Sequence, residues 1–227
     1  MGNFNRQKSI SQPKLVLHLI IFLICFISVI LHVIYSPVPL VSITKFTIQS
    51  NLIVSLTFLF SSFTLLKRKD DDSLLAYFKN ASVLFMAVCI LTYHFLLASG
   101  GEYEGFRIIT NFTLHYLIPI LVFLNWLLFE SKQKYRFRSI LYWMIFPAIY
   151  TAVSLLRGLV DGFYPYFFFN PNGEIPAGVG SYANVGLFIV AFLLVLAVFG
   201  AVLIIFNRLF IYFSRTPQQE VKKTKVL

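Results

Sequence analysis

The chain has 227 residues, of which 58% are hydrophobic, 18% are aromatic and only 12% are charged. Soluble domains carry about 25% charged residues, so this composition excludes a soluble enzyme, a secreted disulfide-stabilised domain and a disordered protein. The net charge of +10 would suggest nucleic-acid binding in a soluble protein, but the placement of the charges along the chain indicates another origin.

Six apolar runs divide the chain, and each is long enough to cross a bilayer as a helix. The runs are continuously apolar and do not alternate, which excludes a transmembrane β-barrel. The first run is too long for the apolar region of a signal peptide, so we count it as a helix. The predicted helices are 15–35, 46–66, 75–98, 107–129, 138–156 and 183–206.

The sequence therefore predicts an all-α polytopic membrane protein, a six-transmembrane helix bundle formed by residues 15–213. Residues 1–14 are expected to form an N-terminal segment and residues 214–227 a tail. Both cysteines, Cys25 and Cys89, lie inside apolar runs, so we expect no structural disulfide.

The basic residues follow the predicted topology closely. Sixteen of the 19 Lys and Arg residues fall in the N-terminal segment, the second and fourth connections and the tail. The other three connections hold one each: Lys45, Arg107 and Arg157. Because cytoplasmic segments are enriched in Lys and Arg, both termini are predicted to be cytoplasmic, and we expect residues 67–72 to form a solvent-exposed charged loop.

This distribution also predicts the partners and the location. A basic rim faces anionic headgroups, so membrane lipids are the expected partners and nucleic acid is not. We expect an integral protein of a bacterial cytoplasmic membrane. The pattern contains no signal for an oligomeric state.

Polar residues within the helices gather at the external side, whereas the cytoplasmic halves show little beyond His18 and the Ser and Thr residues of the second helix. Three helices carry such residues at spacings of three or four, which places them on one helical face. These residues are Thr47, Ser50 and Asn51; Asn111 and His115; and Ser154, Arg157 and Asp161. We predict a polar cavity open to the external leaflet, or alternatively interhelical hydrogen bonds worth about 0.6 kcal/mol each.

Common catalytic signatures are missing from the sequence. There is no nucleophile elbow, zinc-binding helix motif or phosphate-binding loop, and neither His94 nor His115 has a second ligand one turn away. We therefore expect no metal and no cofactor. A two-residue site remains open, with a hydroxyl activated by His115 as general base.

The candidate nucleophile of such a site is Thr47 or Ser50, and Asn51 or Asn111 would donate to an oxyanion. Arg157 is either an interfacial anchor or a clamp for a carboxylate or phosphate.

Two further features concern the external side. Six of the seven residues from Phe163 to Phe169 are aromatic, which is typical of an interfacial anchor or, alternatively, of a lid over a lipid-binding cleft. Pro119 and Pro147 lie inside predicted helices four and five and should kink them.

Residues 45–52 and 111–116 resemble the androgen-induced membrane protein family, which includes intramembrane threonine hydrolases of fatty-acid esters of hydroxy fatty acids. The likeness, to a short prokaryotic branch of six-helix proteins, extends over residues 15–213. It is supported by Pro119, 126–129, 157–158 and 164–166.

The resemblance implies that Thr47 is the nucleophile, that His115 is the essential histidine and that a fatty-acid ester is the substrate. The chain has Phe112 where the hydrolases have a second histidine, and its Asn51 follows Thr47 by four residues, not three. Ser50 therefore remains a rival nucleophile. A non-enzymatic carrier or binding protein for lipids or small amphiphiles, and a structural or sensory membrane protein, are the alternative functions.

Overall fold

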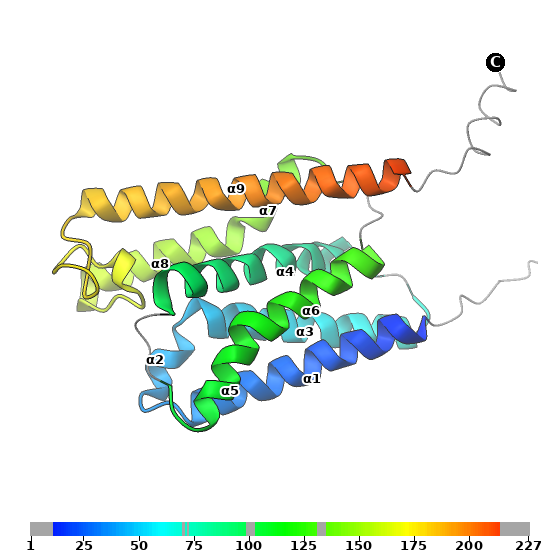
Figure 1. Cartoon of the computed structure of the whole chain (residues 1–227), viewed down its shortest axis with the longest axis horizontal. Coiled ribbons are helices and arrows are strands. Elements are labelled where there is room, and N and C mark those ends of the chain that lie inside the picture. Colours follow the sequence, from blue (N-terminus) through cyan, green and yellow to red (C-terminus); the bar gives the residue numbers. More distant parts are fainter. Residues whose placement is uncertain (1–10, 70, 72, 99–102, 131–134, 214–227) are drawn as a thin grey trace, which may run out of the picture.

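The computed structural model describes residues 11–69, 71, 73–98, 103–130 and 135–213. Within this part of the chain every regular element is a helix, and six helices are long and apolar enough to cross a membrane (Figure 1). The predicted all-α six-helix bundle is confirmed. The spans are Gln12–Ile34, Phe46–Leu66, Ser73–Leu97, Phe106–Glu130, Arg138–Asp161 and Tyr182–Tyr212. The predicted tail 214–227 and residues 1–10 of the predicted N-terminal segment lie outside the described residues.

Several spans consist of more than one helical element. The single-element spans are α1 (Gln12–Ile34), α3 (Phe46–Leu66) and α9 (Tyr182–Phe213). The composite spans are α4 (Ser73–Thr92) with η1 (Tyr93–Leu97); α5 (Phe106–Phe112), η2 (Thr113–Leu117), α6 (Ile118–Asn125) and η3 (Trp126–Glu130); and α7 (Arg138–Trp143) with α8 (Ile145–Asp161). The short elements α2 (Pro39–Ile43) and η4 (Phe167–Phe169) lie in connections.

Helix α1 begins, and helix α9 finishes, at the same end of the bundle (Figure 1). We call this the terminal end and the opposite one the distal end. The positive-inside pattern predicts that the terminal end faces the cytoplasm. The span Ser73–Leu97 is the most enclosed. Of its most apolar 18-residue stretch 61% is buried, against 22% for Arg138–Asp161 and for Tyr182–Tyr212. The outer helices α8 and α9 therefore turn most of their apolar surface outward, as lipid-facing helices do.

Both prolines coincide with irregular helix geometry. Pro119 has no amide hydrogen, so the carbonyl of His115 loses its usual partner four residues on, and the preceding turns, Thr113–Leu117, adopt a wider π-helical form. Pro147 acts likewise on Trp143, where α7 ends before α8 begins at Ile145. His115 of the predicted site therefore lies in the π-helical segment that directly precedes the turn with Pro119.

The terminal end differs from its prediction. Lys79 is buried on α4 and forms ion pairs with Asp71 and with Glu130 (2.6 Å), and Glu130 also pairs with Lys14 (2.7 Å). The predicted solvent-exposed loop is therefore wrong for Asp71, whereas Asp70 and Asp72 lie outside the described residues. The physical reason is that a buried ammonium must be paired, and the chain turn before α4 brings Asp71 to it.

Other polar side chains join this cluster. His18 Nε2 lies 2.9 Å from Asn125 Oδ1, and the Tyr135 hydroxyl donates to Asn80 Oδ1 (2.6 Å). The expectation that the cytoplasmic halves hold few polar groups is therefore also wrong. These contacts tie α1, α4, α6 and the segment before α7 together at the terminal end.

Candidate active site

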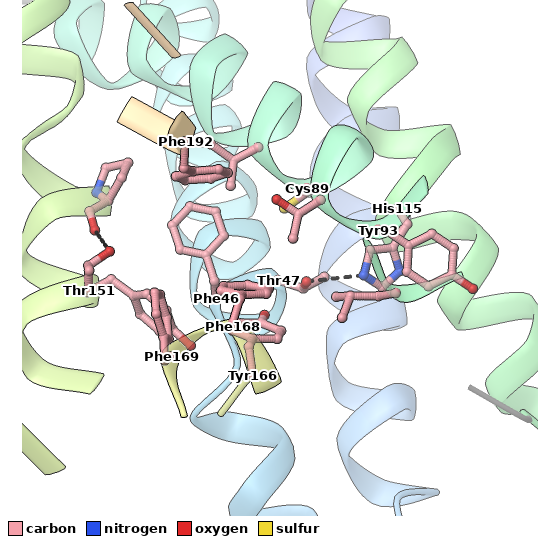
Figure 2. Close-up of a pocket in the computed structure, with 15 residues that line it drawn as sticks. Phe46, Thr47, Cys89, Tyr93, His115, Thr151, Tyr166, Phe168, Phe169 and Phe192 are labelled. Atoms are coloured by element: carbon pink, nitrogen blue, oxygen red, sulfur yellow. Dashed lines mark hydrogen bonds between the residues drawn. The ribbon is translucent and has the colours of Figure 1, made fainter. Parts of the chain in front are cut away.

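Thr47 and His115 meet inside the distal half of the bundle. Thr47 is the second residue of α3, and His115 lies in the π-helical segment η2, 68 residues later. Thr47 Oγ1 and His115 Nε2 are 3.1 Å apart and hydrogen-bonded (Figure 2), and both side chains are buried, with 8% and 6% exposure. This pair is the hydroxyl and imidazole that the sequence singled out.

The second ring nitrogen of His115 fixes its tautomer. Nδ1 lies 2.9 Å from the backbone carbonyl oxygen of Asn111, and because a carbonyl can only accept, Nδ1 of the neutral ring must hold the proton. Nε2 is then left with a lone pair that accepts the Thr47 hydroxyl proton. The Tyr93 ring stacks on the imidazole at a centroid distance of 4.0 Å. The imidazole is thus oriented as a base toward Thr47.

Both side chains lie in the wall of an apolar cavity (Figure 2). The lining comes from α3, α4, η1, η2, α8, α9 and the 163–169 segment. The other lining residues are Phe46, Val88, Cys89, Thr92, Tyr93, Leu97, Pro147, Tyr150, Thr151, Tyr166, Phe168, Phe169 and Phe192. The pair therefore faces a space suited to hydrocarbon, and the predicted polar cavity is wrong because aromatic and aliphatic side chains form most of its lining.

A second apolar cavity adjoins the first one beside α9. It shares Pro147, Thr151, Phe168, Phe169 and Phe192 with the first. Its remaining lining comes from Leu96, Phe188, Ile189 and Leu193. The two cavities are therefore neighbours, and residues of α9 line both of them.

The aromatic segment after α8 lines part of the first cavity. Phe168 and Phe169 are buried, with 9% and 6% exposure, and Tyr166 stacks on Phe168 at 5.0 Å. All three line the first cavity. The segment therefore forms part of the cavity wall, and its role as a lid or as an interfacial anchor stays a prediction.

The three remaining polar candidates near the pair surround it without lining the cavity. Asn51 Nδ2 donates to the backbone oxygens of Thr47 (2.8 Å) and Leu114 (3.4 Å). Ser50 Oγ donates to the Thr47 oxygen (3.3 Å), and Asn111 Nδ2 donates to the Tyr93 hydroxyl (2.6 Å). These donors are committed to positioning α3, η2 and Tyr93. Their suggested part in binding an oxyanion, and that of Ser50 as nucleophile, stay predictions.

Arg157 lies apart from the pair. Its Nε donates to Asp161 (3.0 Å), and its guanidinium is 4.1 Å from the ring centre of Phe163. It lines a separate groove of about 550 Å³ with Ser154 and Gln49. The structure does not bring Arg157 into the cavity of Thr47, and its pairing resembles that of an interfacial anchor.

Tyr93 and Tyr166 are site residues that sequence reasoning missed. Burial, reinforced by the neighbouring Tyr150, raises the pKa of Tyr166 well above its ordinary value, although hydrogen bonding to Thr47 acts in the opposite direction. Tyr166 therefore stays protonated and can donate a hydrogen bond. Thr92 Oγ1 also lines the cavity and is buried without a partner. In an apolar sequence a tyrosine of the site cannot be told from a tyrosine of the core. Only the packing and hydrogen bonds of the folded chain distinguish the two.

No group of three or more metal-binding side chains occurs among the residues that the structure describes. Comparison of the chain with protein-family models, curated proteins and solved structures found no match. The chemistry must therefore be argued from the site itself.

Proposed function

We propose that the protein is an intramembrane hydrolase of lipid esters, with Thr47 as nucleophile and His115 as general base. One observation carries the proposal. The Nδ1–H bond to the Asn111 carbonyl leaves the Nε2 lone pair of His115 directed at the Thr47 hydroxyl, in the wall of an apolar cavity.

In the first step Thr47 Oγ1 attacks the carbonyl carbon of the ester, and its proton moves to His115 Nε2. The tetrahedral intermediate collapses as the carbon–oxygen bond to the alcohol breaks, and His115 returns the proton to the departing alkoxide. The acyl group is then held on Thr47. A water deprotonated by His115 attacks this ester, which releases the carboxylic acid and restores the Thr47 hydroxyl.

Charge on the carbonyl oxygen needs donors that face the cavity. Thr47 is the second residue of α3, and the first amides of a helix have no partner within it. This helix end also carries the positive end of the helix dipole. The hydroxyls of Tyr166 and Thr92 add two candidate donors.

The two adjoining cavities support an acylated substrate. A carbonyl beside Thr47 would leave its hydrocarbon chain in the second cavity, between Leu96 and the α9 residues Ile189 and Leu193. We also propose membership of the androgen-induced family, in which Thr47 and His115 would match the nucleophile and the essential histidine.

A lipid or amphiphile carrier is the second candidate. It is favoured by the partner of His115 Nδ1, which is a backbone carbonyl and lacks the charge with which a carboxylate stabilises an imidazolium. In a carrier the same cavity would bind its ligand without covalent chemistry.

Labelling with a fluorophosphonate separates the two candidates. The detergent-purified wild type should form a covalent adduct as Thr47 Oγ1 displaces fluoride from phosphorus. Thr47→Val, which keeps the shape but not the hydroxyl, and His115→Gln should abolish labelling. Thr47→Ser should retain it.

Ser50→Ala is the matched control for the rival nucleophile and should label like the wild type. Loss of labelling in Ser50→Ala alone would transfer the nucleophile to Ser50. A monodisperse wild type that shows no labelling would contradict the hydrolase and favour the carrier.

A further inference from the structure

Within the described part of the chain, two basic residues at the distal end have no acidic partner. Lys45 and Arg107 are both half-buried, and the ion pairs among the described residues involve Lys14, Lys79 and Arg157 instead. Glu104, a described carboxylate near Arg107 in sequence, is exposed and forms no such pair. Half-buried cations are usually compensated, so this pair requires an explanation.

The side chains around Arg107 hold its guanidinium in a defined position. The guanidinium lies 5.0 Å from the ring centre of Tyr103, and Nε is buried with no hydrogen-bond partner. His32 of α1 packs on the same tyrosine, with ring centres 6.1 Å apart, and its Nδ1 lies 2.9 Å from Thr110 Oγ1. Arg107 is thus held in place by its neighbours while one of its donors has nothing to bind.

Lys45 lies at the same end of the bundle as Arg107, directly before α3. Burial, and then the charge of Arg107, lowers the pKa of Lys45. The two residues are 62 positions apart and belong to different segments, the N-cap of α3 and the start of α5. Folding therefore places two like charges at one end of the bundle, an arrangement that an anion bound between them would stabilise.

We propose that Lys45 and Arg107 bind the phosphate or carboxylate group of a membrane amphiphile at the distal end of the bundle. A guanidinium with a free Nε–H suits the two oxygens of such a group, and an ammonium adds a compact charge. His32 and Thr110 line one side of the site. Nothing in this site requires the Thr47–His115 pair to be catalytic.

The position of the site relates it to the cavity. Lys45 precedes Thr47 by two residues, and Arg107 lies two helical turns before His115. An anion held there would sit at the outer end of the same two segments that present the reactive pair. The proposal thus adds a polar anchor to an otherwise apolar binding region.

Thermal unfolding of the full chain in dodecyl maltoside tests this site, with phosphatidic acid and diacylglycerol of identical acyl chains as probes. Phosphatidic acid at about 100 times its Kd should raise the wild-type Tm by about 5 °C or more, and diacylglycerol should not. Lys45→Gln and Arg107→Gln should each lose most of this shift. The exposed Lys67→Gln at the terminal end removes the same charge and should keep it.

The Tm without lipid separates binding from structural roles. If the two cations repel each other, Lys45→Gln and Arg107→Gln should unfold at the same or a higher temperature than the wild type. A lower Tm in both variants would mean that the residues are structural and would overturn the proposal. So would a phosphatidic acid shift that survives in both variants.

Inorganic phosphate distinguishes the source of the anion. A shift with phosphate alone would mean that the site takes the free ion, whereas a shift with phosphatidic acid alone would assign it to a lipid headgroup. Both results support an anion site. No shift with either probe would refute it.

Discussion

The two ends of the bundle differ in how their charged side chains are compensated. At the terminal end, Lys14 and Lys79 are matched by Asp71 and Glu130, and the cluster is neutral. At the distal end, Lys45 and Arg107 have no acidic partner among the described residues, and Thr92 Oγ1 is buried without a hydrogen bond. A neutral cluster of paired charges serves to hold helices together. Unsatisfied groups beside a cavity are what a ligand would complete, so stability should depend on one end and chemistry on the other.

The largest expected effect separates the ends directly. Replacing His115 with Gln removes the base, and hydrolysis of a long-chain nitrophenyl ester in mixed micelles should fall by about 10²–10⁴-fold. The Tm should change little. Loss of less than tenfold in rate would show that the distal pair is not catalytic.

The reciprocal experiment is at the terminal end. Lys79→Met leaves Asp71 with no positive partner among the described residues and Glu130 with only Lys14, which should destabilise the fold by about 3–5 kcal/mol. The Tm should drop by about 10 °C, while the rate per folded molecule is retained. Lys67→Met, on the exposed surface, is the control. Equal Tm values for the two variants would contradict a stabilising role of the cluster.

A smaller effect is expected for Tyr93, which both positions His115 and contributes to the stability of the fold. Tyr93→Phe keeps the ring on His115 but removes the acceptor of Asn111 Nδ2. A buried amide without its partner costs about 1–3 kcal/mol, and kcat should decrease more than KM increases. Tyr116→Phe, which loses only a contact with the exposed His94 (3.2 Å), should have neither effect. A change confined to KM would show that Tyr93 contacts substrate and does not position the base.

The smallest effect is a difference in acid sensitivity. Burial alone would raise the pKa of Asp71, but the charge of Lys79 and hydrogen bonds from Lys79, Thr64 and Ser61 hold it below its ordinary value. Its stabilisation is therefore complete above the unfolded-state pKa of about 3.9 and is lost as the pH falls through the lower folded-state value.

Between pH 5 and pH 3 the wild-type Tm should consequently fall more steeply than that of Asp71→Asn. Glu174→Gln, at an exposed position in the distal connection, should retain the wild-type slope. Parallel curves for wild type and Asp71→Asn would refute the pairing with Lys79.

The sequence predicted the six helices well because apolar length and charge placement report directly on crossing a bilayer. Polar residues inside apolar helices are few, which made Thr47, Ser50 and His115 candidates, and only the family resemblance preferred Thr47 over Ser50. The sequence did not predict the terminal cluster. One of the two partners of Lys79, Glu130, lies 51 residues away in the chain, and a basic residue near a helix end looks like part of a cytoplasmic rim.

Helical spacing also has a limit at the site itself. It places Asn51 and Asn111 near the pair, but it does not show that backbone carbonyls and Tyr93 already occupy their amide donors. Nor does it show that Arg157 pairs with Asp161 one turn away. Hydrogen-bond competition of this kind is decided only when the helices pack.

The sparse packing of α9 has a kinetic consequence. Both apolar cavities beside Thr47 are lined in part by α9, one of the two least buried spans, so under the proposed function a substrate dissolved in the bilayer would arrive by diffusion in two dimensions. Turnover would then follow the mole fraction of substrate in the membrane, and adding inert phospholipid would slow the reaction while the bulk concentration of substrate stayed the same.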